Sequence, residues 1–265
     1  MASNDTCTLP ITLSNEAQEF LAADDVTLPE FKQEVLEKDA QKNWDKFYKR
    51  NTTLFYKDRH WTSREFPELS SGKCILLEAG CGVGNFLFPL LDSNPDLFIY
   101  ACDFSPRAID FVKNNELYDD RRCKAFQCDI TSHEITTNVP LSSVDFGSLI
   151  FVLSAIHPDK MVQALKNIKQ VLKPGGCVLV RDYGLYDHAM LRFKPGHKLA
   201  ENHYVRQDNT RAYYFSLEKL DELFEVAGFV CIERSYVQRR TVNKKEEIDV
   251  PRIFVQGRYQ KVADV

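Results

Sequence analysis

An α/β fold, with a parallel sheet covered by helices on both faces, is the architecture that this 265-residue sequence predicts. Two observations support it. Beyond residue 73, short β-type runs alternate with helical stretches, and such alternation is typical of βαβ units. The segment LLEAGCGVGNFLFPLL at 76–91 joins an apolar run, three alternating glycines and a second apolar run. This pattern predicts a buried strand, a tight turn and the start of a helix.

The predicted elements of this core follow in chain order. The strands are expected at 74–79, 97–102, 123–128, 144–153 and 176–182, and the helices at 83–92, 106–115 and 159–172.

The alternation stops at the aromatic-rich stretch 184–215. Within it, YVRQDNTRAYYF predicts a hairpin that turns at Asp208 and Asn209. Ser216 is then expected to cap a helix that Gly228 ends. The runs FVCIERSYVQ and PRIFVQGRYQ predict a terminal antiparallel pair of strands.

The N-terminal part divides into two predicted segments. Residues 1–26 are polar, acidic and without periodicity, so we expect a mobile acidic arm. Over 27–70 we expect a helical segment, with one long amphipathic helix that starts near Thr27 and Pro29. The α/β domain then covers 71–262, with 184–215 as an insertion.

Charge is distributed unevenly along the chain. The net charge is −4, but residues 1–40 alone carry −7, whereas 41–64 hold seven basic and two acidic side chains. The aromatics between these basic residues are compatible with nucleic-acid binding, and a solvated helix face is the alternative. No run of 18 apolar residues and no signal peptide is found, so we expect a cytoplasmic protein with possible access to the nucleus and no membrane partner.

The cysteines predict neither disulfides nor a metal site. None of the eight forms a C-x-x-C pair, and several lie within apolar runs, where cysteine behaves as a small buried residue. We therefore expect no metal.

The glycine turn limits the choice of ligand. A P-loop needs Gly-Lys-Ser or Gly-Lys-Thr, whereas Gly84 is followed by Asn85 and Phe86. A dinucleotide turn needs its third glycine where Asn85 stands. Asp103, at the end of the second strand, can accept hydrogen bonds from both ribose hydroxyls of a nucleoside, so on these residues alone a nicotinamide reductase stays open.

Further residues resemble the class I methyltransferases that use S-adenosyl-L-methionine (AdoMet). The resemblance rests on Glu78-Ala-Gly-Cys-Gly-Val-Gly, Asp103, Asp129 and the Leu-Lys-Pro-Gly-Gly at 172–176, in this order. It implies a Rossmann-like seven-stranded sheet with an antiparallel terminal strand and AdoMet as cofactor. AdoMet has no phosphate, and its positive sulfonium and amino groups suit a carboxylate just before the turn.

Longer stretches resemble a narrower family, the tRNA 3-methylcytidine methyltransferases. They include AQKNWDKFYKRN, FYKDRHWTSREF, LSAIHPDKM, RDYGLYDHAMLRF and ENHYVRQDNTRAYYF, and the similarity runs from about Phe31 to Tyr259. The resemblance implies methylation of cytidine 32 in the tRNA anticodon loop. The chain is most similar to the member that acts on serine tRNAs with help from seryl-tRNA synthetase.

This resemblance also implies the cofactor residues. By position they are Trp44, Tyr48, Gly80, Asp103, Asp129 and Ile150. The segment around Gly80 adds Glu78 and Gly82, and Phe104 follows Asp103. The N-terminal helix would then close over AdoMet as a lid, with core packing as the alternative role of Trp44.

The acceptor site is expected at the end of the fifth strand. Cytosine N3 has a free lone pair, so the enzyme has to extrude and orient the base rather than deprotonate it. We assign Asp182 to the exocyclic amine of the flipped cytosine and Tyr183 to stacking or hydrogen bonding with it. The residues expected to hold the nucleotide, its phosphate or the tRNA are Arg59, Arg206, Asp208, Lys49 and Arg50.

Three alternatives accompany this hypothesis. One is an AdoMet methyltransferase acting on a small molecule or a protein, and another is a non-catalytic partner subunit. The reductase is the third. His60, His157 and His188 share no metal-binding spacing, so we expect structural hydrogen bonds from them.

Overall fold

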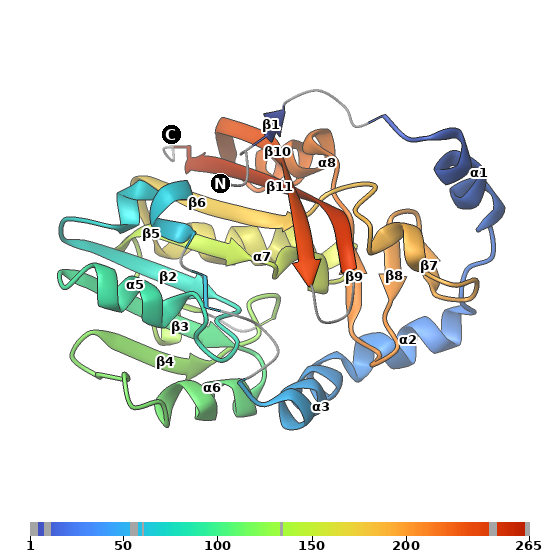
Figure 1. Cartoon of the computed structure of the whole chain (residues 1–265). Helices are drawn as coiled ribbons and strands as arrows, with labels where there is room; N and C mark the ends of the chain where they lie inside the picture. The colour runs from blue at the N-terminus through green and yellow to red at the C-terminus, as the bar shows by residue number, and fades with distance from the viewer. Residues whose placement is uncertain are drawn as a thin grey trace.

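A mixed eight-stranded sheet forms the centre of the computed structural model, which describes residues 5–7, 12–53, 58–59, 61–132, 135–243 and 248–262. The strand order is β1-β10-β11-β6-β5-β2-β3-β4 (Figure 1). The strands are β1 (Asp5–Cys7), β2 (Cys74–Ala79), β3 (Leu97–Asp103), β4 (Cys123–Gln127), β5 (Val144–Ile150), β6 (Leu172–Tyr183), β10 (Phe229–Asn243) and β11 (Ile248–Lys261).

The sheet confirms the predicted topology. Strands β2 to β6 are parallel, and β11 and β10 continue the sheet beside β6 as the predicted antiparallel pair. These seven strands make the Rossmann-like sheet. Strand β5 ends at Ile150 rather than at 153. The preceding helix ends at Val171, directly before Leu-Lys-Pro-Gly-Gly, and β6 already starts at Leu172, which pairs with Val144 before the register shifts to Phe146 and Cys177.

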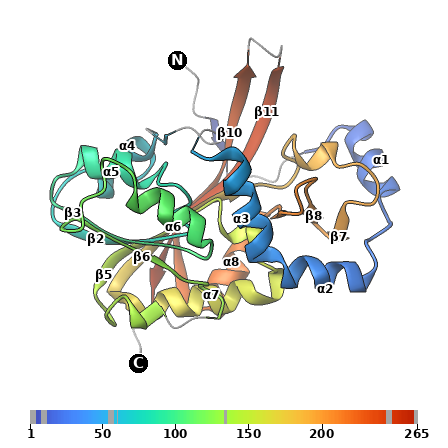
Figure 2. The same ribbon diagram turned by 90° about the horizontal axis from the view of Figure 1, so that it is seen from below.

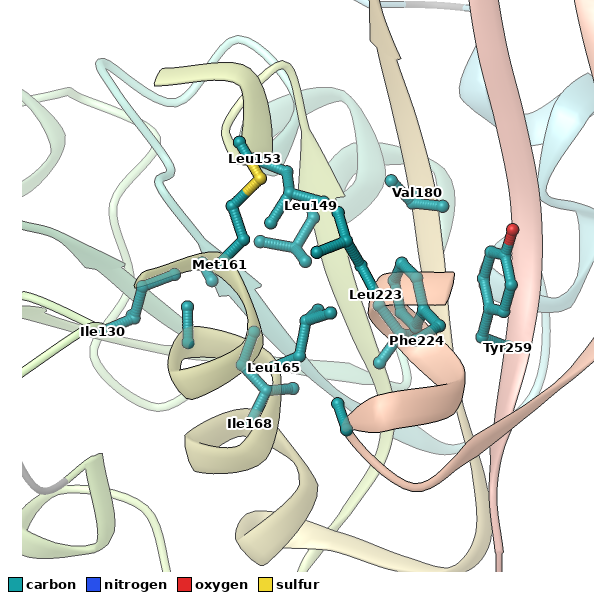
Figure 3. Close-up of a cluster of buried hydrophobic side chains, with 14 of the residues drawn as sticks. Ile130, Leu149, Leu153, Met161, Leu165, Ile168, Val180, Leu223, Phe224 and Tyr259 are labelled. Atoms are coloured by element: carbon teal, nitrogen blue, oxygen red, sulfur yellow. The ribbon is translucent and has the colours of Figure 1, made fainter. Parts of the chain in front are cut away.

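Helices cover both faces of the sheet. The helices beside the parallel strands are α5 (Leu87–Ser93), α6 (Pro106–Lys113), α7 (Pro158–Val171) and α8 (Leu217–Val226). Helices α7 and α8 pack on one face, where Leu165, Leu149 and Phe224 belong to the larger core cluster (Figure 3). Helices α5 and α6 contribute to the cluster on the opposite face. The cap predicted at Ser216 is confirmed, since its side chain accepts a hydrogen bond from the Lys219 N–H at 3.0 Å.

The N-terminal part corrects two expectations. Residues 1–26 are not without structure: β1 pairs with β10, and α1 spans Asn15–Ala23. The expected long helix is two helices, α2 (Glu30–Lys38) and α3 (Ala40–Asn51), which meet at Asp39. Asp39 takes φ −91° and ψ 8° there, in keeping with the preference of Asp for helix ends over helix interiors. The short helices α4 (Thr62–Glu65) and η1 (Pro67–Leu69) follow before β2.

The insertion forms a small sheet of its own. Strands β7 (Lys198–Ala200), β8 (His203–Val205) and β9 (Arg211–Tyr213) are antiparallel, and Asn209 in the β8–β9 turn has φ 66°. The predicted hairpin is therefore confirmed. Figure 2 shows α1 and α2 beside this sheet, while β10 and β11 project beyond the central sheet.

Two further expectations concern cysteines and membranes. The described cysteine side chains carry free thiols that are buried or half-buried, namely Cys74, Cys81, Cys102, Cys123, Cys128, Cys177 and Cys231. Among the helices of the described ranges, none is long and apolar enough to cross a membrane.

Candidate active site

A cavity of about 330 Å³ opens at the carboxyl ends of the parallel strands. This is the edge at which open α/β sheets place ligands, beside the point where the strand order reverses between β2 and β5. A smaller pocket of about 40 Å³ adjoins it over the glycine turn. The predicted cofactor residues each line one or both of these spaces: Trp44, Tyr48, Glu78, Gly80, Gly82, Asp103, Phe104, Asp129 and Ile150.

The glycine turn after β2 is shaped by positive φ angles. Gly80 has φ 72° and Gly82 has φ 55°, a region that side chains disfavour. A Cβ on Gly80 would lie 2.4 Å from a Val152 methyl, so glycine is required here by packing within the protein. At Gly82 the added Cβ would lie 3.1 Å from the Tyr48 hydroxyl, so this glycine lets helix α3 approach the turn.

Two buried carboxyl groups flank the turn. Asp103 accepts hydrogen bonds from the Gly82 N–H at 3.0 Å and the Ser105 N–H at 2.9 Å. Burial raises its pKa to about 6 against these bonds. Burial raises the pKa of Glu78 to about 8, with Arg59 opposing and Asp103 adding to the shift. Within the described residues Glu78 Oε2 has no hydrogen-bond partner, and such an orphaned buried acceptor fits a cationic ligand group.

Helix α3 borders the same two spaces as these carboxyl groups. The side chains of Trp44 and Tyr48 line both the cavity and the smaller pocket. Asp45 accepts hydrogen bonds from the Ser105 hydroxyl at 3.0 Å and from the Arg107 side chain at 3.2 Å, and it thereby ties α3 to the start of α6. The side chain of Gln41 donates to the Phe104 carbonyl at 2.6 Å. These bonds hold α3, which carries Trp44, against the segment that joins β3 to α6.

The predicted acceptor residues lie next to the cavity rather than on its surface. Asp182 is 0% exposed, and its two oxygens accept from the N–H groups of Ser154 at 2.9 Å and Tyr183 at 2.8 Å. Burial raises its pKa to about 6, opposed by the hydrogen bonds of Ser154 and Tyr183 and by the charge of Arg206. The half-buried Tyr183 ring lies 5.2 Å from the ring of Phe151, between centroids.

Phe151 lies between the cavity and Tyr183. It lines both spaces and takes φ 62°, a strained conformation for an aromatic residue. Its N–H donates to the Arg181 carbonyl at 2.8 Å. Arg59 holds the same turn: its guanidinium donates to the Ile150 carbonyl at 3.1 Å and lies 5.1 Å from the Phe151 ring centroid.

The residues predicted to contact the tRNA lie in two places, the last turn of α3 and the β8–β9 hairpin. Lys49 and Arg50 are exposed in the last turn of α3, and Arg50 forms an ion pair of 3.4 Å with Asp208 in the β8–β9 turn. The Arg206 guanidinium lies 5.4 Å from the Tyr183 ring centroid. The structure thus brings Arg206 to Tyr183 but places Lys49 and Arg50 away from the cavity lining.

Sequence reasoning missed several residues that line the cavity. They are Glu37, Gln41, Phe151, Val152, Lys160 and Arg211. Phe151 and Val152 fell inside the strand predicted at 144–153, and because β5 ends at Ile150 both lie just beyond the strand, at its carboxyl end. The hydrogen bond expected of His157 is present, because its ring caps α7 by accepting from the Asp159 N–H at 3.3 Å. His60 lies outside the described residues.

Comparison with known proteins identifies a methyltransferase domain and its relatives. A family model described as a methyltransferase domain matches residues 77–178. Human tRNA N(3)-cytidine methyltransferase METTL6 is 58% identical over 255 residues, which cover 94% of this chain and 90% of the human protein. The mouse METTL6 is 59% identical over the same shares, and Xenopus tropicalis tRNA N(3)-cytidine methyltransferase METTL2 is 42% identical over 88% of this chain and 81% of its own.

Solved structures agree on the fold. A SAM-dependent methyltransferase from Anabaena variabilis has a TM-score of 0.62 at 12% identity, covering 83% of this chain and 94% of its own. A structure described for the conversion of a disulfide bond into a thioacetal group during echinomycin biosynthesis also has a TM-score of 0.62. It is 13% identical and covers 85% and 94% of the two chains.

Proposed function

This chain belongs to the tRNA N(3)-cytidine methyltransferase family, and we propose that it methylates N3 of cytidine 32 in the anticodon loop of serine tRNAs. Its methyl donor is AdoMet. The geometric observation that supports the proposal is the position of Phe151, which lines the cofactor cavity and also contacts Tyr183. A base held at Tyr183 would thus lie beside the cofactor. We further propose that the protein acts in the cytoplasm and has access to the nucleus.

The residues around the cavity suit this cofactor. AdoMet supplies an electrophilic methyl group on a positively charged sulfur. We assign Asp103 to the ribose hydroxyls, because an ionised carboxylate has capacity for more acceptor contacts than its two backbone bonds use. Glu78, with an orphaned oxygen, is assigned to the cationic amino group. Trp44 and Tyr48 cover the site and exclude water.

The acceptor face needs orientation rather than a base. We propose that Tyr183 and Phe151 stack on the extruded cytosine and that Arg206, above the Tyr183 ring, holds its nucleotide. Asp182 is proposed to accept from the exocyclic amine. Since Asp182 does not line the cavity, this role includes a shift of the Tyr183 ring that opens the carboxylate to the base.

The decisive assay uses total tRNA and labelled AdoMet, followed by mapping of the modified nucleoside. We expect 3-methylcytidine at position 32. Transfer to a small molecule or a protein with none to tRNA would favour the first alternative, and AdoMet binding without transfer to any of them would favour the non-catalytic subunit.

Glu78 predicts a pH dependence of cofactor binding. With a pKa of about 8, its carboxyl group is mostly protonated at pH 7, whereas pairing with the amino group of AdoMet needs the ionised form. Binding should therefore release a proton, and affinity should rise several-fold from pH 6 to about pH 7, below the range in which an α-amino group with a pKa of about 7.7–8.0 titrates. Calorimetry at pH 7 in two buffers of different ionisation enthalpy measures the released proton.

Glu78→Gln is the matched control for this prediction, because it keeps the shape and removes the titration. We expect weaker binding by the variant, with less proton release and a flatter pH profile. Equal proton release by the wild type and the variant would contradict the assignment.

We propose that seryl-tRNA synthetase assists the enzyme. Phosphate contacts give affinity without sequence information, and the basic segment 41–64 of an acidic chain supplies few of them. A synthetase that already holds the tRNA would raise its effective concentration at this enzyme. The expectation is that the synthetase stimulates methylation of serine tRNA, more at moderate than at low salt. Full activity of the enzyme alone at moderate salt would refute it.

Charge reversal at Lys49 and Arg50 tests the tRNA grip separately. Both side chains are exposed at the end of α3, outside the cavity lining. Lys49→Glu with Arg50→Glu should remove most tRNA binding and leave AdoMet binding unchanged. The matched control is Lys113→Glu with Lys166→Glu, two exposed lysines on α6 and α7. Similar tRNA affinities for the two double variants would argue against this surface.

A further inference from the structure

The lid is joined to the insertion mainly through polar contacts. Helix α2 contains no buried residue. The Leu28 N–H donates to the Lys198 carbonyl at 2.8 Å, and the Gln33 side chain donates to the Leu199 carbonyl at 3.0 Å. Figure 2 shows α2 beside β7 and β8 along this contact. Because these contacts join the lid (helices α2 and α3) to the insertion (184–215), the two are positioned to move as one unit.

Glu37 is the centre of this junction. From the last turns of α2 its carboxylate forms ion pairs with Lys160 in α7 and with Arg211 in β9. Arg211 is 5% exposed and Glu37 27%, and all three residues line the cavity. Burial by itself would raise the pKa of Glu37, but the hydrogen bonds and charges of Lys160 and Arg211 outweigh burial and lower it. The carboxylate is thus held in the ionised form that both partners need.

A continuous series of contacts leads from this ion pair to the acceptor side. The guanidinium of Arg206 donates to the Arg211 carbonyl at 2.7 Å and lies above the Tyr183 ring. Tyr183 in turn contacts Phe151, which lines the cofactor cavity. Arg211 therefore contacts both Glu37 of the lid and Arg206, which is assigned to the acceptor nucleotide.

We propose that Glu37 is a positioning residue that couples AdoMet binding to tRNA binding, by joining the lid to the insertion and to α7 through Arg211 and Lys160. AdoMet favours the closed lid, because Trp44 and Tyr48 line its cavity. A tRNA held by Arg206 favours the insertion position that meets Glu37. Each ligand then raises the affinity for the other, by the same factor. The inference rests on the proposed function only in taking tRNA as the second ligand.

The test is a binding cycle with a cofactor that cannot react. The affinity for S-adenosylhomocysteine is measured by calorimetry with and without saturating serine tRNA. For the wild type we expect roughly fivefold or greater tightening by tRNA, the lower end of typical allosteric coupling. Glu37→Gln should reduce this factor to about one and weaken S-adenosylhomocysteine binding even without tRNA.

Two further variants make the result specific. Glu34→Gln removes the same charge from an exposed position on α2 and should keep the wild-type coupling. Lys160→Gln, whose side chain is 50% exposed, should lose part of it with little effect on folding. Wild-type coupling in Glu37→Gln, or no coupling in the wild type, would overturn the proposal. Methylation at a nucleotide other than cytidine 32 would overturn the proposed function instead and leave the measured coupling in support of this inference.

Discussion

Asp103→Ala is expected to lower the affinity for AdoMet by about a hundredfold or more. The ribose hydroxyls would lose a charged acceptor, and hydrogen bonds to charged groups contribute about 1.5–3 kcal/mol each. The substitution also leaves the N–H groups of Gly82 and Ser105 without the carboxylate that orders the turn. Calorimetric titration with AdoMet measures the loss.

Controls for this prediction separate binding from folding. Asp103→Asn keeps the volume of the side chain but removes its charge, and we expect an intermediate loss. Asp110→Asn, at an exposed position on α6, removes a similar charge and should bind as the wild type does. A folded Asp103→Ala variant with unchanged affinity would remove Asp103 from the cofactor site.

Asp182→Ala should reduce methyl transfer to tRNA by about a hundredfold or more while AdoMet affinity stays within a few-fold. Transfer would lose the proposed acceptor for the cytosine amine. The substitution would also leave the buried N–H groups of Ser154 and Tyr183 without an acceptor, and each unsatisfied group costs roughly 1–3 kcal/mol. Single-turnover methylation at saturating AdoMet, compared with calorimetric AdoMet binding, gives both quantities.

A pH profile distinguishes a direct role of Asp182 from a purely structural one. Its pKa is about 6, so the ionised acceptor is lost as the pH falls through this value, and transfer by the wild type should decline there. Asp182→Asn has no such titration. Asp103 also has a pKa of about 6, so the profile is recorded with AdoMet saturating at every pH, and the low activity of Asp182→Asn should then not change near pH 6. Transfer by folded Asp182→Ala within a few-fold of the wild type would end the assignment.

The sequence alone determined the parallel core and the sheet edge at which the candidate site lies. Strands β2 to β6 were predictable because strands buried on both faces form short apolar runs between turn residues, and these signals are local. The glycine turn and Asp103 were predictable for a related reason. Parallel strands align their carboxyl ends, so residues that end successive strands meet at one edge whatever the remaining packing. The cap at Ser216 depends only on its own first helical turn.

The tertiary structure decided everything that depends on where distant segments meet. The hydrophobic spacing between Glu30 and Asn51 is compatible with one long helix. Only the structure shows that this segment breaks at Asp39 and that α2 lies beside the insertion. Phe151 adopts φ 62° because contacts from β6 and from Arg59 hold its turn. This backbone conformation is strained, and no local sequence pattern reveals it.

Burial and long-range ion pairing were decided in the same way. Asp182 ends a predicted strand as expected, yet its 0% exposure depends on the neighbouring loop and the insertion. Glu37 is one of nine acidic residues in the first forty, and its pattern is that of a solvated helix face. Its partner Arg211 is 174 positions away, so the charge pattern could not identify the pair. Glu37 lines the cavity as an ionised group because folding partly buries it and supplies the charges of Lys160 and Arg211, and both conditions come from segments far apart in the chain.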